Sequence, residues 1–207
     1  MSNNKSGDNR YKEYQEPIYV WYAITQQMIS IEERLLILLA YVDNIQKIPE
    51  DNILLSFWDT TISSVLESLI LAYARLFDKS STYNNENCSI AQLNSLIKNY
   101  KRISVNDKYM LQEKFDEFHN TNADIKSIIH DYRCKRCAHN DLEIIFSKCE
   151  NDLSLDALCD LYSSILELIR LCGKYIFGAI DGKTSIYNER TKYGIVFESM
   201  IKQHTEE

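Results

Sequence analysis

The feature that most constrains the fold is an apolar stripe at helical spacing in residues 17–46. Its members follow one another in alternating steps of three and four: Trp21, Ile24, Met28, Ile31, Leu35, Leu38, Val42 and Ile45. This spacing places them along one side of an α-helix, as in helical bundles and coiled coils. Pro17 is a favoured first-turn residue, and Pro49 follows the segment. The pattern predicts a long helix that must bury this side against others.

Residues 51–78 carry a second stripe of the same kind. Its members are Leu55, Trp58, Ile62, Val65, Leu69, Tyr73 and Leu76. Because only a short turn containing Pro49 separates the two segments, we expect an antiparallel helical hairpin. Residues 79–88 have no periodicity and are predicted to be a loop.

Three further helical regions are predicted downstream. Ser89 followed by Gln92 is a capping signature, which predicts a short helix over 89–100. Residues 105–139 form a longer region with an interruption predicted near 119–121, and 154–178 form the last. The stripe of the longer region is Leu111, Phe115, Phe118, Ile125, Ile129 and Tyr132. The stripe of the last is Leu158, Leu161, Ile165, Leu168, Cys172 and Ile176.

Composition supports an all-α chain built as one bundle of about five helices. Only 5 Gly and 2 Pro occur in 207 residues, too few for the turns of a many-stranded sheet. The length suits a single core. We therefore predict a disordered polar N-terminus at 1–16, the helical bundle at 17–180, and an extension at 181–207 that forms a short hairpin or a last helix.

Charge and hydropathy limit the location and the partners. The net charge is −7, so a basic surface for polyanions is excluded, and nucleic acid would have to bind locally. The N-terminus lacks the apolar segment of a signal peptide, and the longest apolar run, LLILLAYV, is too short for a membrane span. We expect a cytoplasmic protein without membrane contact, whose six cysteines are reduced thiols.

The stretch YRCKRCAHND, residues 132–141, carries the densest positive charge in the chain. Continuing the stripe of 105–139 beyond Tyr132 in steps of three and four leads to Arg136 and His139. Arg133 lies about 120° from His139 around an ideal helix and about 9 Å along it. Charged residues thus occupy positions on the same side of the helix as the residues that face the core in the preceding turns. This indicates a polar cleft at the end of the bundle or a surface that meets a second copy.

Together with LILAYARLFDKSS at 69–81, this stretch resembles the HEPN superfamily in its Abi-type branch, associated with abortive infection and toxin systems. The resemblance covers roughly residues 20–178. It implies a helical bundle that dimerises and brings two Arg-His motifs into one cleft, in many members a metal-independent ribonuclease without a cofactor. Arg133 and His139 are the motif pair. The association with toxin systems also raises an antitoxin protein as a partner.

The chemistry can also be argued from the residues. RNA carries its own nucleophile, the 2′-hydroxyl, so cleavage needs a proton acceptor, a proton donor and a cation beside the phosphate. Histidine can fill either proton role near neutral pH, and the guanidinium of arginine matches phosphate oxygens. One chain offers one suitable histidine, His139, and one or two arginines. A two-fold dimer would double the number of these groups.

Several neighbours are candidates for substrate binding or for support of the pair. Asn140 and Asp141 could orient His139, and Tyr132 could stack on a base or belong to the core. Arg75 and Asp78 could form a second-shell or structural ion pair. His119 and His130 are predicted to be surface residues without partners.

Less specific interpretations remain beside the enzyme. The Arg-His end could be a solvated helix terminus. Cys134 and Cys137 could bind zinc or form a redox pair, although two small residues in a helix interface are the more ordinary explanation. Many active HEPN relatives have a polar residue directly after the motif Arg, where this chain has Cys134. That departure favours a second hypothesis, a catalytically inactive module that binds a nucleotide, RNA or a protein.

Overall fold

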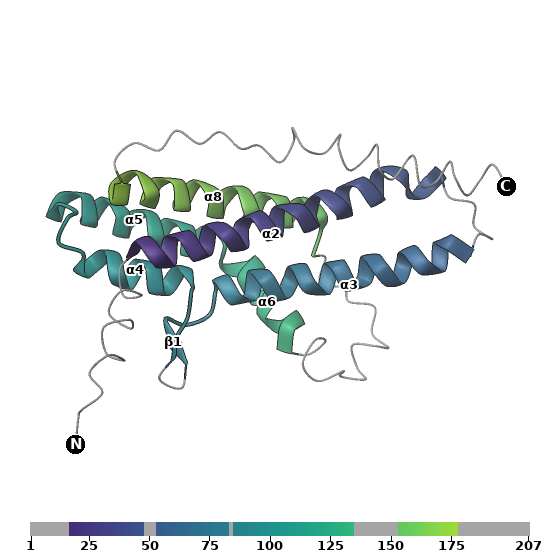
Figure 1. The fold of residues 1–207 in the computed structure, drawn as a ribbon, viewed down its shortest axis with the longest axis horizontal. Coiled ribbons are helices and arrows are strands. Elements are labelled where there is room, and N and C mark those ends of the chain that lie inside the picture. Colours follow the sequence, from purple (N-terminus) through teal and green to yellow (C-terminus); the bar gives the residue numbers. More distant parts are fainter. Residues whose placement is uncertain (1–16, 48–52, 83–84, 135–152, 178–207) are drawn as a thin grey trace, which may run out of the picture.

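The computed structural model describes residues 17–47, 53–82, 85–134 and 153–177, and most of them are helical (Figure 1). This confirms the predicted fold class at the level of secondary structure. The predictions for the two chain ends lie outside the described residues.

Six α-helices and one small strand pair make up the described part of the chain. The helices are α2 (Pro17–Asn44), α3 (Ile53–Leu76), α4 (Ile90–Asn99), α5 (Val105–Thr121), α6 (Ala123–Tyr132) and α8 (Leu155–Phe177). A 3-10 turn, η1 (Ile45–Lys47), continues α2. Within the predicted loop, β1 (Ser81–Thr82) pairs antiparallel with β2 (Asn85–Glu86).

Helix α2 is the central element and contacts α8, α3 and α4 (Figure 1). Ile24, Ile31 and Leu35 are fully buried, as the stripe predicts. The prediction is wrong at Val42, whose side chain is 57% exposed. An α-helix has 3.6 residues per turn, so a stripe with a period of 3.5 rotates by about 20° per heptad. In the second half of α2, the buried side therefore widens to include Leu36 and Leu39 beside Leu35 and Leu38.

Close contact between α2 and α8 depends on a glycine. The Trp21 indole donates a hydrogen bond of 2.7 Å to the carbonyl of Ile169. A Cβ atom at Gly173 would lie 3.0 Å from the Trp21 ring, so the missing side chain lets the ring lie against α8. Phe177 meets the same ring edge-on at 5.0 Å between centroids.

Helix α3 is fixed to α8 through a buried tyrosine. Tyr73 is fully buried, and its hydroxyl donates a hydrogen bond of 2.7 Å to the carbonyl of Leu158. Burial raises the pKa of this hydroxyl well above its usual value. The apolar residues predicted for α8 from Leu158 to Cys172 are buried in the same core.

The caps of the middle helices follow the sequence closely. Ser89 accepts a hydrogen bond from the backbone N–H of Gln92, which confirms the predicted start of α4. The predicted interruption of 105–139 is also present, at Asn122 between α5 and α6. The amide of Asn122 donates to the carbonyl of Phe118 at 2.9 Å and to Ser164 Oγ at 3.0 Å. After this break, α6 contacts α3.

No helix in the described ranges has both the length and the apolar character that crossing a bilayer requires.

Candidate functional site

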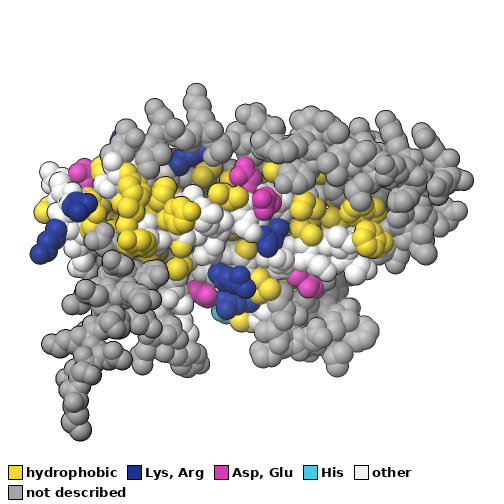
Figure 2. Space-filling view, viewed as in Figure 1, with side chains coloured by type: hydrophobic (Ala, Val, Ile, Leu, Met, Phe, Trp, Pro, Cys, Tyr) yellow, Lys and Arg dark blue, Asp and Glu magenta, His cyan; other side chains and the backbone are white. Residues whose placement is uncertain are grey.

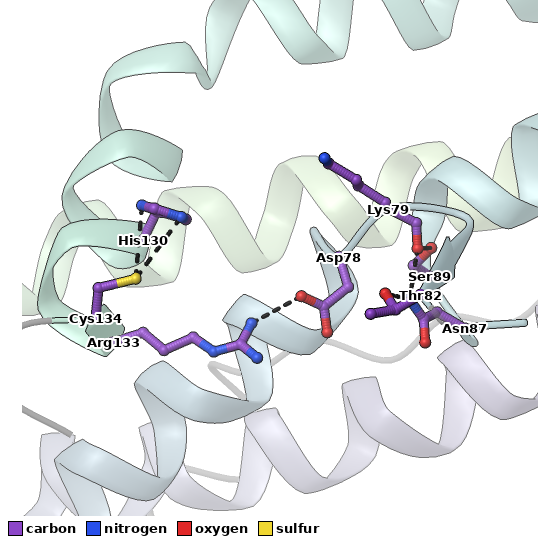
Figure 3. A network of polar contacts seen from close by, with 8 residues as sticks. All are labelled: Asp78, Lys79, Thr82, Asn87, Ser89, His130, Arg133 and Cys134. Carbon is purple, nitrogen blue, oxygen red and sulfur yellow. Dashed lines mark hydrogen bonds and ion pairs between the residues drawn. The ribbon is translucent and has the colours of Figure 1, made fainter. Parts of the chain in front are cut away.

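The end of α6 is joined to the end of α3 by an ion pair. Arg133 Nη1 lies 2.7 Å from Asp78 Oδ1 (Figure 3). The two side chains are 39% and 33% exposed. At that exposure the pair contributes up to about 1 kcal/mol to stability. Within the described ranges, Asp78 takes one guanidinium donor of Arg133, and the other donors can bond a further partner.

Asp78 is held in place by the turn that ends α3. Its backbone N–H donates to the carbonyl of Arg75 at 3.3 Å, so the chain leaves the helix in a tight turn. The following loop is fastened by Asn87, whose side-chain amide donates to the Lys79 carbonyl and to Thr82 Oγ1, both at 2.8 Å (Figure 3). The carboxylate that meets Arg133 therefore comes from a well-connected segment.

A histidine and a cysteine lie beside Arg133. His130 Nε2 is 3.8 Å from Cys134 Sγ one turn along the helix (Figure 3). Its Nδ1 atom is 3.6 Å from Asp131 Oδ1, and the His130 side chain is 72% exposed. The imidazole is thus open to solvent and next to a carboxylate, although it is not the predicted motif histidine.

A second cationic group lies on the same face of α6. Lys126 and Arg133 are seven residues apart, which is about 20° around an ideal helix and about 10 Å along it. Lys126 Nζ is 2.9 Å from His119 Nδ1 and 5.4 Å from the centre of the Phe77 ring. Burial lowers the pKa of Lys126. In Figure 2, basic atoms gather with acidic and histidine atoms in the part of the molecule where Figure 1 places α6 beside α3.

The family model for AbiU2, a HEPN family, matches residues 22–194 of the chain. The chain belongs to the AbiU2 family of HEPN proteins. The match includes both stretches that carry the resemblance, 69–81 and 132–141. No functionally curated protein and no solved structure matches the chain.

In this AbiU2-family protein, four of the predicted site residues lie outside the described residues: Arg136, His139, Asn140 and Asp141. Arg133 is described and is close to Asp78. Whether His139 converges with Arg133 stays a prediction. The same holds for the interpretation of Cys137 as a partner of Cys134. Among the described residues, no group of three or more His, Cys, Asp or Glu side chains could hold a metal ion.

The remaining predicted residues have different surroundings from those expected. Asp78 pairs with Arg133 and not with Arg75, which is exposed in the last turn of α3. Tyr132 is partly buried and packs against the core, in agreement with its core interpretation.

The prediction that His119 lacks a partner is wrong. It contacts Lys126 across the break between α5 and α6. Burial, and then the charge of Lys126, lower the pKa of His119, while Asp116 opposes the shift. Sequence reasoning did not single out Lys126. Its distance of seven residues from Arg133 was the signal that could have found it.

Proposed function

We propose that this AbiU2-family HEPN protein is a metal-independent endoribonuclease that acts as a homodimer through Arg133 and His139. The observation that carries the proposal is the position of Arg133. Its guanidinium is held at the end of α6 by Asp78, a residue from the other sequence stretch that carries the family resemblance. It remains partly exposed, as a phosphate contact requires.

Asp78 acts in this proposal as a positioning residue. A free arginine side chain samples many rotamers, and ordering it on substrate binding costs free energy. The bond to Asp78 fixes the guanidinium before the substrate arrives. The carboxylate of Asp78 offsets part of the positive charge of Arg133. The remaining guanidinium donors can still bond phosphate oxygens.

The reaction that fits these residues is transesterification within the RNA strand. His139 as a base takes the proton of a 2′-hydroxyl, whose oxygen attacks the adjacent phosphorus. The bond to the 5′-oxygen breaks, and this oxygen takes a proton from an acid. Arg133 stabilises the negative charge that builds up on the phosphate oxygens. The products are a 2′,3′-cyclic phosphate and a 5′-hydroxyl.

The dimer supplies the second proton-transfer group. One imidazole cannot act as base and acid in the same step, whereas two symmetry-related copies of His139 can divide the roles. In the same proposal, Arg136 adds positive charge to the cleft, while Asn140 and Asp141 orient His139. The toxin-like branch makes an antitoxin protein a further partner, with cytoplasmic RNA as the target.

The proposal is tested by incubating purified protein with RNA in the presence of a chelator. We expect cleavage by the wild type, products that end in a cyclic phosphate, and loss of cleavage by about a hundredfold or more in His139→Ala. Sedimentation should show a dimer, and circular dichroism should show an unchanged fold in the variant. Cleavage that persists in His139→Ala would contradict the proposal.

One observation favours a second function, a catalytically inactive module that binds RNA, a nucleotide or a protein through the same surface. Cys134 follows Arg133 directly, at the position where many active relatives have a polar residue. Its side chain lies against His130. This alternative predicts that wild-type protein binds RNA but leaves it intact. RNA cleavage by the wild type excludes this alternative, whereas cleavage that occurs only in Cys134→Asn supports it.

A further inference from the structure

Lys126 has an unusual environment for a lysine. Within the described part of the chain, its ammonium group contacts the ring nitrogen of His119 and the face of Phe77, and no carboxylate. The two cations with which it can be compared are both paired. Arg133 has Asp78, and Lys114 on α5 has Glu117 at 2.6 Å.

This environment costs stability. The ammonium is half-buried, and desolvation lowers its pKa, so the charged form is less favourable here than in water. A cation–π contact and one hydrogen bond to a neutral imidazole compensate only partly. An uncharged side chain of similar length would pack at this position at lower cost. Residues that lower stability in this way are expected at functional sites, so the charge of Lys126 is best explained by a ligand that it binds.

The geometry connects Lys126 with the proposed site. It lies on the same face of α6 as Arg133, about two helical turns away. The two residues that meet them are consecutive at the end of α3: Phe77 lies under Lys126, and Asp78 pairs with Arg133. Two cations that come from one helix face, from residues about 10 Å apart along the helix axis, can contact two phosphates of the same strand.

We propose that Lys126 binds a backbone phosphate of single-stranded RNA, next along the strand to the phosphate at Arg133. This inference rests on the proposed function, because it extends the same substrate along α6. A single strand is favoured because the 2′-hydroxyl must reach a position in line with the breaking bond, which the regular geometry of a duplex prevents.

The test measures binding separately from cleavage. The probe is a fluorescent 2′-O-methyl RNA of about eight nucleotides, which cannot be cleaved and lies within the site sizes of single-strand binding proteins. Its affinity is followed by anisotropy at several salt concentrations. Each phosphate contact contributes about 0.7 to the slope of log affinity against log salt.

We expect Lys126→Met to reduce that slope by about 0.7. Lys126→Arg keeps the charge and should keep the wild-type slope. Lys114→Met, which removes an exposed lysine on another helix, should also leave it unchanged. The thermal midpoint of Lys126→Met should be equal to or above that of the wild type, whereas a purely structural role predicts a lower one.

Three results would overturn the inference: a wild-type slope in Lys126→Met, an equal loss in Lys114→Met, or wild-type protein that does not bind the probe. The outcome is distinguishable from that of the nuclease proposal. RNA cleavage with a wild-type slope in Lys126→Met keeps the nuclease and removes the subsite. Binding that depends on Lys126 without any cleavage keeps the subsite and removes the nuclease.

Discussion

The seam between α2, α3 and α8 and the crossing of α6 over the end of α3 are built on different principles. In the seam, apolar side chains are fully buried, and the polar groups of Trp21 and Tyr73 are bonded to backbone carbonyls of α8. At the crossing, charged groups are partly exposed and only partly compensated, as for Arg133 and Lys126. The first region supplies stability, and the second leaves bonding capacity open to a ligand.

A cavity in the core of the seam should have the largest effect on stability. Leu35→Ala removes most of a fully buried side chain from α2 and should lower the free energy of unfolding by about 2–5 kcal/mol. Urea denaturation measures the change. Arg133→Ala is the control from the other region and should cost about 1 kcal/mol or less. Equal losses in both variants would remove the distinction between the regions.

A single hydroxyl tests the polar contacts of the seam. Tyr73→Phe keeps the ring but leaves the carbonyl of Leu158 without this donor, so we expect a loss of about 1–3 kcal/mol. Tyr109→Phe removes an exposed hydroxyl and serves as the matched control. Comparable denaturation midpoints for the two variants would show that the buried bond contributes little.

Asp78→Asn tests the ion pair at the crossing. The amide cannot pair with the Arg133 charge, so kcat for RNA cleavage should fall by about tenfold, equivalent to about 1.4 kcal/mol, with little change in KM. Stability should change by less than about 1 kcal/mol, because the pair is partly exposed. Asp78→Glu should restore part of the rate. A fall in stability without a change in kcat would make Asp78 structural only.

The smallest effect concerns pH. The pKa of His119 lies below its usual 6.5, mainly because of burial and then because of Lys126. The unfolded chain therefore takes up this proton first, and the contribution of neutral His119 to stability is lost as pH falls below about 6.5. Denaturation is measured at about pH 7.5 and at about pH 5.5, one value above and one below the usual pKa of histidine. Between the first and the second, wild type should lose more stability than His119→Gln. Parallel losses would contradict this assignment.

Much of the helical bundle could be predicted from the sequence because the information for its helices is local. The period of the stripes identifies the helices, and Ser89 with Gln92 marks the start of α4. The errors also have a local cause. Val42 follows the heptad spacing but not the true rotation of a straight α-helix, and so it turns toward solvent.

The candidate site could be predicted only in part. Arg133 was found from its motif, but its partner Asp78 is 55 residues away, and their contact depends on how α6 leaves the break at Asn122. Spacing suggested a local pair between Asp78 and Arg75 instead. The contact of His119 with Lys126 likewise spans the break, where helical periodicity gives no information.

In the proposed function, Arg133 contacts the substrate and contributes little to the stability of the fold. The most direct measurement compares RNA cleavage in chelator by wild type, Arg133→Ala and the control Arg102→Ala, an exposed arginine before α5. We expect the cleavage rate of Arg133→Ala to fall by about a hundredfold or more, with a nearly unchanged denaturation midpoint, and we expect a wild-type rate in Arg102→Ala. Wild-type cleavage by Arg133→Ala, or wild-type protein that leaves RNA intact, would contradict it.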